Sequence, residues 1–135
     1  GEENVRQDRR SSVIHDPESP EYIVQKPRVA VQGDGWREMI LGENPQVYFS
    51  LRRLEFEKQC EQDTKGELFH VLALVDGDAV RVRSVEHPER YFDMQFMDII
   101  CVPADMGKYV VENLGKEPVM VHKTCLREGY QNDPR

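Results

Sequence analysis

The sequence predicts an all-β fold of the sandwich, jelly-roll or barrel type, and three observations support this. Short apolar stretches rich in β-branched and aromatic residues recur at intervals of roughly ten residues, with turn residues between them. Residues 79–85 alternate cleanly, which would place Val80, Val82 and Ser84 on one face of a strand. No stretch carries the apolar period of a helix of two turns.

Turn and breaker residues divide the expected strands. Pro27 separates two short N-terminal candidates, and a proline there favours a sheet edge or a break. Turn residues stand at 33–35 and 42–45, and a further turn is expected at 113–118. Asp76-Gly77 is a strong hairpin signal. The expected strands comprise residues 21–25, 28–32, 36–41, 47–56, 68–75, 79–85, 97–102, 109–111 and 119–124.

The length suits a single domain. A chain of 135 residues buries roughly two-thirds of its unfolded surface. Residues 1–20 are polar and charged, with two prolines late in the stretch, so we expect a flexible N-terminal arm. The domain would then span residues 21–130, followed by a tail at 131–135. No apolar run approaches the roughly 20 residues of a membrane helix, so no membrane partner is expected.

The charge argues against a nucleic-acid partner. The net charge is −7 and the pI is about 5.1, and a surface dominated by carboxylates repels a phosphate backbone. Two local clusters of arginine, at residues 6–10 and at Arg52-Arg53, are expected to be solvated surface.

The cysteines argue for a reducing, cytoplasmic setting. Three cysteines stand far apart without a CxxC pair, which favours neither a disulfide framework nor a zinc knuckle. Cys101 lies in an apolar run and is expected to be a small core residue.

Two segments carry a resemblance to a known family. Residues 69–78, FHVLALVDGD, and residues 98–113, DIICVPADMGKYVVEN, resemble the two signatures of the cupin superfamily. More narrowly, FHVL…DG followed by VPADMGKY resembles the C-terminal cupin domain of type I mannose-6-phosphate isomerases, over roughly residues 45–126. The resemblance implies a cupin-type double-stranded β-helix, a jelly-roll barrel, here with extra N-terminal strands.

The resemblance also implies where metal ligands would fall, since cupin enzymes hold a divalent metal with histidines and a carboxylate. Counting back seven residues from Gly77 puts His70 at the family's glutamate position. The histidine pair would fall among residues 63–66, which hold no histidine. Tyr109, after the turn at 103–107, replaces the last histidine. One ligand in four remains, so neither a metal site nor a metal cofactor is expected.

His70 has two interpretations. It is a hydrogen-bonded core residue, or it lines a small pocket together with Tyr109, which the family's arrangement aims at the barrel interior. His122 could join them, as could Glu55 or Arg53, depending on the face that each occupies. We predict His70, Tyr109 and His122 as ligand-binding residues, and no catalytic residue.

Three functions remain open. The first is a non-catalytic module that binds a sugar-like molecule or supports a larger enzyme, as the isomerase resemblance implies; the start at Gly1 fits an excised piece. The alternative is a free-standing metal-dependent cupin enzyme, an oxygenase or an isomerase such as an aldose–ketose isomerase, using His70, His122 and a carboxylate. The third is a structural module that forms a homodimer through edge strands at residues 22–41. Trp36 is expected to pack between strands, with sugar stacking as the alternative.

Overall fold

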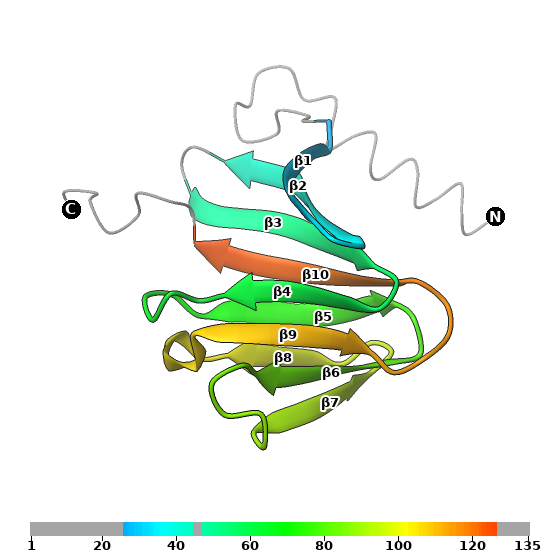
Figure 1. Cartoon of the computed structure of the whole chain (residues 1–135). Helices are drawn as coiled ribbons and strands as arrows, with labels where there is room; N and C mark the ends of the chain where they lie inside the picture. Colours follow the sequence, from blue (N-terminus) through cyan, green and yellow to red (C-terminus); the bar gives the residue numbers. More distant parts are fainter. Residues whose placement is uncertain (1–25, 45–46, 127–135) are drawn as a thin grey trace.

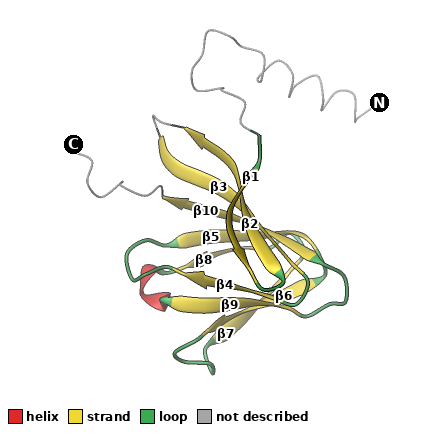
Figure 2. Ribbon diagram, turned by 45° about the horizontal axis from the view of Figure 1, so that its top comes forward, coloured by secondary structure: helices red, strands yellow, loops and turns green. Residues whose placement is uncertain are grey.

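The computed structural model describes residues 26–44 and 47–126. They form two antiparallel sheets that face each other, shown in Figures 1 and 2. The larger sheet has the order β1-β2-β3-β10-β5-β8, and the smaller has the order β4-β9-β6-β7. The predicted all-β jelly roll with extra N-terminal strands is confirmed. The arm expected at 1–20, the strand at 21–25 and the tail at 131–135 lie outside the described residues.

The strands follow the predicted order, with two additions. They are β1 (Arg28–Gly33), β2 (Trp36–Asn44), β3 (Val47–Phe56), β4 (Gln59–Asp63), β5 (His70–Asp76), β6 (Ala79–Ser84), β7 (Tyr91–Gln95), β8 (Ile99–Val102), β9 (Lys108–Asn113) and β10 (Val119–Leu126). The sequence did not predict β4 and β7, which have five residues each. β4 has little apolar content, whereas β7 contains Tyr91, Phe92 and Met94. A 3-10 turn, Ala104–Met106, precedes β9. No helix in the described ranges is long and apolar enough to cross a membrane.

The core lies between the two sheets. In β5 and β6 every second side chain is buried, as the pleat of a strand requires. The predicted alternation of Val80, Val82 and Ser84 is confirmed. Both sheets contribute to the core cluster, whose members are Leu54, Phe56, Cys60, Leu72, Leu74, Val80, Val82, Met94, Val102, Tyr109, Val111, Val119 and Val121.

The turn at Asp76-Gly77 does not close a hairpin, so that prediction is wrong. The strand before it, β5, pairs with β10 and β8. The strand after it, β6, pairs with β7 and β9 in the other sheet. The chain therefore crosses between sheets here. Gly77 has a φ of 130°, and a Cβ at this position would lie 2.4 Å from Val119 Cγ1. The turn residues mark the reversal of the chain but not the partner of each strand.

β2 extends further than predicted. It continues to Asn44, through part of the turn expected at 42–45, while it pairs with β3. The pairing shifts register between Ile40 and Gly42 and again between Glu43 and Asn44. Irregularities of this kind accommodate turn residues inside a ladder.

Cys101 is exposed, which corrects the prediction of a core residue. The run at 97–102 is not buried as a whole, since Met97 and Ile99 are 68% and 69% exposed. Its strand, β8, is at the edge of the six-stranded sheet, and only Val102 of its four residues is buried. A continuous apolar run does not distinguish an edge strand with one solvated face from a central strand buried on both.

Trp36 packs between strands, as predicted. Its indole lies over Gly33, where an added Cβ would meet the ring nitrogen at 2.1 Å. The ring is partly buried and packs against the core cluster. The turn at 33–35 between β1 and β2 is confirmed, and Gly35 supplies a φ of 77°.

Candidate functional site

A cleft of about 990 Å³ opens between the two sheets. Side chains from β1, β2, β3, β4, β5, β9 and β10 line it, so both sheets contribute. Its lining includes Trp36, Glu38, Arg52, His70, Tyr109 and Lys123. The volume lies at the upper end of the roughly 300–1,000 Å³ usual for small-molecule sites.

The structure brings His70 and Tyr109 together inside this cleft. The Tyr109 hydroxyl lies 2.7 Å from His70 Nδ1, and the two rings meet edge to face. Tyr109 is fully buried, and His70 is 7% exposed. Both sequence interpretations of His70 hold geometrically, because the ring is a hydrogen-bonded interior residue and also lines the cleft.

The protonation of this pair follows from its burial. Burial, followed by the nearby Lys123 charge, lowers the pKa of His70 to about 4. Burial raises the pKa of Tyr109 well above its usual value. His70 is therefore neutral and Tyr109 protonated at neutral pH. The described part of the chain gives the buried tyrosine hydroxyl no other acceptor, and an O–H left unpaired in the interior is costly. We therefore assign the hydroxyl as the donor to Nδ1, which leaves the imidazole proton on Nε2.

Three side chains form a buried polar triangle at the floor of the cleft. Lys123 Nζ lies 2.9 Å from Glu38 Oε2 and donates to Gln62 Oε1 at 2.6 Å. Gln62 Nε2 donates to Glu38 Oε1 at 3.1 Å. The three residues are 5%, 3% and 9% exposed, in the order Lys123, Glu38, Gln62. Their satisfied hydrogen bonds allow two opposite charges to remain in the interior.

Arg52 completes this network, which corrects the prediction that Arg52 and Arg53 are both solvated surface. Arg52 Nη1 donates to Glu38 Oε2 at 2.8 Å, and its Nε donates to Ser50 Oγ at 3.1 Å. Burial raises the pKa of Glu38, but the Lys123 charge and the three hydrogen bonds that the carboxylate accepts outweigh it, so the pKa lies below its usual value. Glu38 is ionised at neutral pH.

His122 is on the opposite face of the sheet. Its neighbours in β10, Val121 and Lys123, are buried between the sheets, so His122 points outward. It stands opposite Arg53 of β3 and Ala73 of β5. Arg53 bonds Glu55 at 2.6 Å on this same outer face. The structure therefore brings neither His122 nor these two residues to His70.

The sequence did not predict a role for Glu38, Gln62 or Lys123. One signal could have found Lys123: Val119 and Val121 precede it at two-residue spacing, so alternation alone places the lysine on the core face. Glu38 follows Trp36 in the same way on β2. No signal in the sequence indicates that Glu38 and Lys123 are partners.

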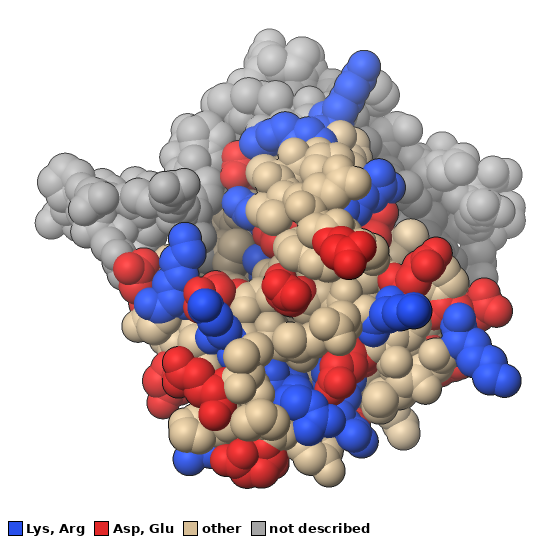
Figure 3. Space-filling model, viewed as in Figure 1, with Lys and Arg blue, Asp and Glu red and all other residues tan. Residues whose placement is uncertain are grey.

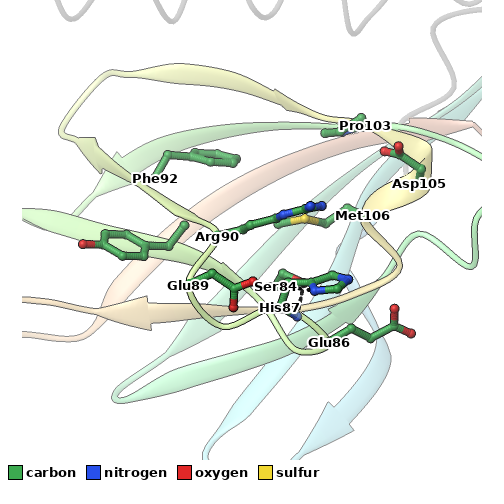
Figure 4. Close-up of a pocket in the computed structure, with 10 residues that line it drawn as sticks. Ser84, Glu86, His87, Glu89, Arg90, Phe92, Pro103, Asp105 and Met106 are labelled. Carbon is green, nitrogen blue, oxygen red and sulfur yellow. Dashed lines mark hydrogen bonds and ion pairs between the residues drawn. The ribbon is translucent and has the colours of Figure 1, made fainter.

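A second, smaller pocket of about 500 Å³ lies beside the loop between β6 and β7 and the turn before β9 (Figure 4). Its lining is mostly exposed and includes three carboxylates, Glu86, Glu89 and Asp105. The backbone N–H of His87 donates to Ser84 Oγ at 3.0 Å, which ties the loop to β6. No buried charge faces this pocket, so the larger cleft is the candidate site.

The fold has counterparts among solved structures, although no family model and no curated protein matches the sequence. The cupin domain of Schizosaccharomyces pombe Cnp3 superposes with a TM-score of 0.55 at 18% identity, covering 76% of this chain and 73% of that one. The chain has a cupin fold. A cupin-superfamily sugar phosphate isomerase from Silicibacter pomeroyi matches at a TM-score of 0.55 and 14% identity, covering 78% and 72% of the two chains. A cupin domain of an XRE-family transcriptional regulator from Enterobacter cloacae matches at 0.57 and 10%, covering 76% and 100%.

The described residues that line the cleft do not fit a metal ion. No group of three or more His, Cys, Asp or Glu side chains in the described residues is arranged to hold one. Cys60 lies next to the polar triangle, but burial raises the pKa of its thiol to about 12. Thr64, where the family's histidine pair would fall, bonds the carbonyl of Ala104 at 2.6 Å instead. The Lys123 ammonium adds a positive charge that would repel a metal cation.

Proposed function

We propose that this cupin domain is a non-catalytic module that binds a small, sugar-like molecule in the cleft between its sheets. The observation that carries the proposal is the buried polar network at the floor of a solvent-open cleft, formed by Glu38, Gln62, Lys123 and Arg52 beside the His70–Tyr109 pair. A sugar is recognised by polar groups of this kind, held in fixed positions. Trp36, at the cleft wall, supplies an apolar face on which a sugar ring can stack.

The protonation states support a role without catalysis. A general base works best when its pKa is near the operating pH. His70 has a pKa of about 4, because burial and the Lys123 charge disfavour the imidazolium. The Glu38 carboxylate is occupied by three hydrogen bonds, and its pKa lies below the usual value. Neither group is suited to abstract a proton from a sugar carbon at neutral pH.

The narrower sequence resemblance supports an accessory role. The domain resembles the C-terminal cupin domain of type I mannose-6-phosphate isomerases, in which the metal and the chemistry belong to a different, N-terminal cupin. In this proposal the domain binds a sugar-like ligand or supports such an enzyme, without performing the isomerisation by itself.

Titration with mannose and mannose 6-phosphate tests the proposal. Trp36 is the one tryptophan of the chain and lines the cleft, so its fluorescence should change as a ligand binds. We expect saturable binding and no formation of fructose 6-phosphate. His70→Phe should weaken binding about tenfold, because it removes the imidazole donor. His122→Phe, on the outer face, is the matched control and should leave binding unchanged.

Two results would contradict this proposal. Absence of a fluorescence change and of heat in calorimetry, for both sugars at millimolar concentration, would exclude the binding role. Turnover of mannose 6-phosphate, or a stoichiometric transition metal in protein purified without a histidine tag, would favour the metal-dependent isomerase instead.

A structural role is a second candidate, compatible with the first, and the exposed edge of the larger sheet favours it. β1 is at that edge, and its Val29 and Val31 are 48% and 45% exposed. An unpaired edge strand with apolar side chains readily pairs with another chain. We propose that a second copy of the domain pairs here.

Light scattering tests the pairing. We expect a dimer at micromolar concentration, and Val29→Lys should weaken it about tenfold or more, because a charge at the edge opposes pairing. A wild-type monomer throughout the micromolar range would rule out the second candidate.

A further inference from the structure

The floor of the cleft has one buried acid, and three of the roughly four acceptor sites of its carboxylate are already used. Among the described residues, Glu38 is the only carboxylate that is buried. Its Oε1 accepts a bond from Gln62, and its Oε2 accepts bonds from Arg52 and Lys123. A ligand group that donates hydrogen bonds therefore gains little binding free energy from this carboxylate.

Donors, in contrast, are left over. The ammonium of Lys123 has three N–H groups and directs two of them to Glu38 and Gln62, while its side chain is only 7% exposed. The guanidinium of Arg52 has five N–H groups, of which two bond Glu38 and Ser50. The Nε2–H of His70 has no partner in the described part of the chain. All three side chains line the same cleft.

The charges of the floor do not cancel. Two cations, Arg52 and Lys123, face one anion, Glu38, so the sum is one positive charge, and both His70 and Gln62 are neutral. The groups at the rim are exposed to water, and solvent weakens their influence on the floor. They are Lys65, Lys108, Glu61, Asp63 and Glu67. A charge inside the cleft therefore interacts most strongly with the floor.

We propose that the cleft selects ligands that carry an oxyanion, a carboxylate or a phosphate, held by the unused donors of Lys123, Arg52 and His70; this inference rests on the proposed binding function. Lys123 provides the positive charge in the interior that a metal ion would otherwise provide. An oxyanion accepts several hydrogen bonds at once and also balances the unpaired positive charge. A neutral hydroxyl accepts fewer hydrogen bonds and leaves the charge unbalanced.

Matched pairs of ligands test the selection. Gluconate is compared with glucose, and mannose 6-phosphate with mannose, so that each pair differs in its anionic group. We expect the anionic member of at least one pair to bind about tenfold or more tightly than the neutral one. The two pairs distinguish a carboxylate from a phosphate as the preferred group.

Two adjacent arginines provide the variant and its control. Arg52→Gln should weaken binding of the anionic ligand about tenfold and change binding of the neutral one by less than about twofold. Arg53→Gln removes the same charge from the neighbouring residue of the same strand, but on the outer face, where Arg53 bonds Glu55. It should change neither.

A second variant, expected to change anion binding in the opposite direction, keeps the test decisive if Arg52→Gln does not fold. Glu38→Gln removes the one buried negative charge and should strengthen binding of the anionic ligand. Circular dichroism checks that each variant is folded.

The outcomes separate the inference from the function on which it rests. Equal binding of anionic and neutral ligands, or anion binding that neither Arg52→Gln nor Glu38→Gln changes, overturns the oxyanion inference and leaves the binding function standing. Absence of binding by all four ligands overturns the binding function and the oxyanion inference together.

Discussion

Lys123→Met is expected to lower the free energy of unfolding by about 3–5 kcal/mol, measured by chemical denaturation. The substitution keeps the volume of the side chain but leaves the Glu38 carboxylate, whose side chain is 4% exposed, without its one buried cation. Removing one partner of a buried ion pair leaves an uncompensated charge in the interior, which costs about this much. Gln62 Oε1 also loses its donor. Arg52 remains to compensate in part, so we expect the lower end of the range.

The double variant Glu38→Gln/Lys123→Met should recover most of this loss. It removes both charges, and replacing a whole buried pair by neutral groups is often close to neutral in stability. Arg37→Met is the matched control. Arg37 bonds Glu55 at 2.6 Å, but its side chain is 48% exposed, so its loss should change stability by less than about 1 kcal/mol.

The comparison between single and double variants is decisive. Two results would contradict this prediction: Lys123→Met has no greater effect than Arg37→Met, or the double variant is as unstable as the single one. In either case the buried charges of Glu38 and Lys123 do not stabilise each other.

Acidification is expected to destabilise the domain between about pH 6.5 and pH 4, by up to about 3 kcal/mol from His70 alone. In the unfolded chain this histidine takes up its proton near pH 6.5, whereas in the folded domain burial lowers its pKa to about 4. The unfolded state therefore binds more protons in this range. The stabilisation is complete above the unfolded pKa and is lost as the pH falls toward the folded one.

His70→Asn isolates this contribution. The asparagine oxygen can take the place of Nδ1 and accept the Tyr109 hydroxyl, but the side chain does not titrate. Denaturation at several pH values should give a flatter dependence for the variant between pH 6.5 and pH 4.5. Glu38 acts in the same direction only below its usual pKa of 4.5. The outward-facing His122 is present in both proteins, so its contribution cancels. Equal slopes in the two proteins would refute this role of His70.

The fold could be predicted from local patterns in the sequence, and half of the site, the His70–Tyr109 pair, from the resemblance to the cupin signatures. Alternation and turn residues located most strands. The turn that ends in Gly107 brought Tyr109 to the interior, within reach of a histidine 39 residues away. The hairpin at Gly77 failed because local turn chemistry does not determine which sheet a strand joins.

The other half of the site depends on contacts that no local pattern contains. Glu38 and Gln62 are 24 residues apart, and Gln62 and Lys123 are 61 residues apart. Each is a common surface residue type that becomes buried only because two others satisfy it. The same holds for Arg52. The sequence shows two adjacent arginines, and nothing in it indicates that Arg52 joins the network while Arg53 lies on the outer face. Alternation predicts the face of a residue but not its partner.

Glu38 and Lys123 also have a consequence for the order of events during synthesis. Glu38 belongs to an early strand, β2, and Lys123 to the last described strand, β10, which pairs between β3 and β5 at the middle of the larger sheet. On the ribosome, the glutamate emerges long before its lysine. Until β10 emerges, the larger sheet lacks a central strand and the carboxylate lacks its buried counter-charge (Figure 1). Because β10 pairs with both β3 and β5, the larger sheet is complete only after this strand has been synthesised. Figure 3 shows positive and negative side chains interspersed over the visible face of the folded domain.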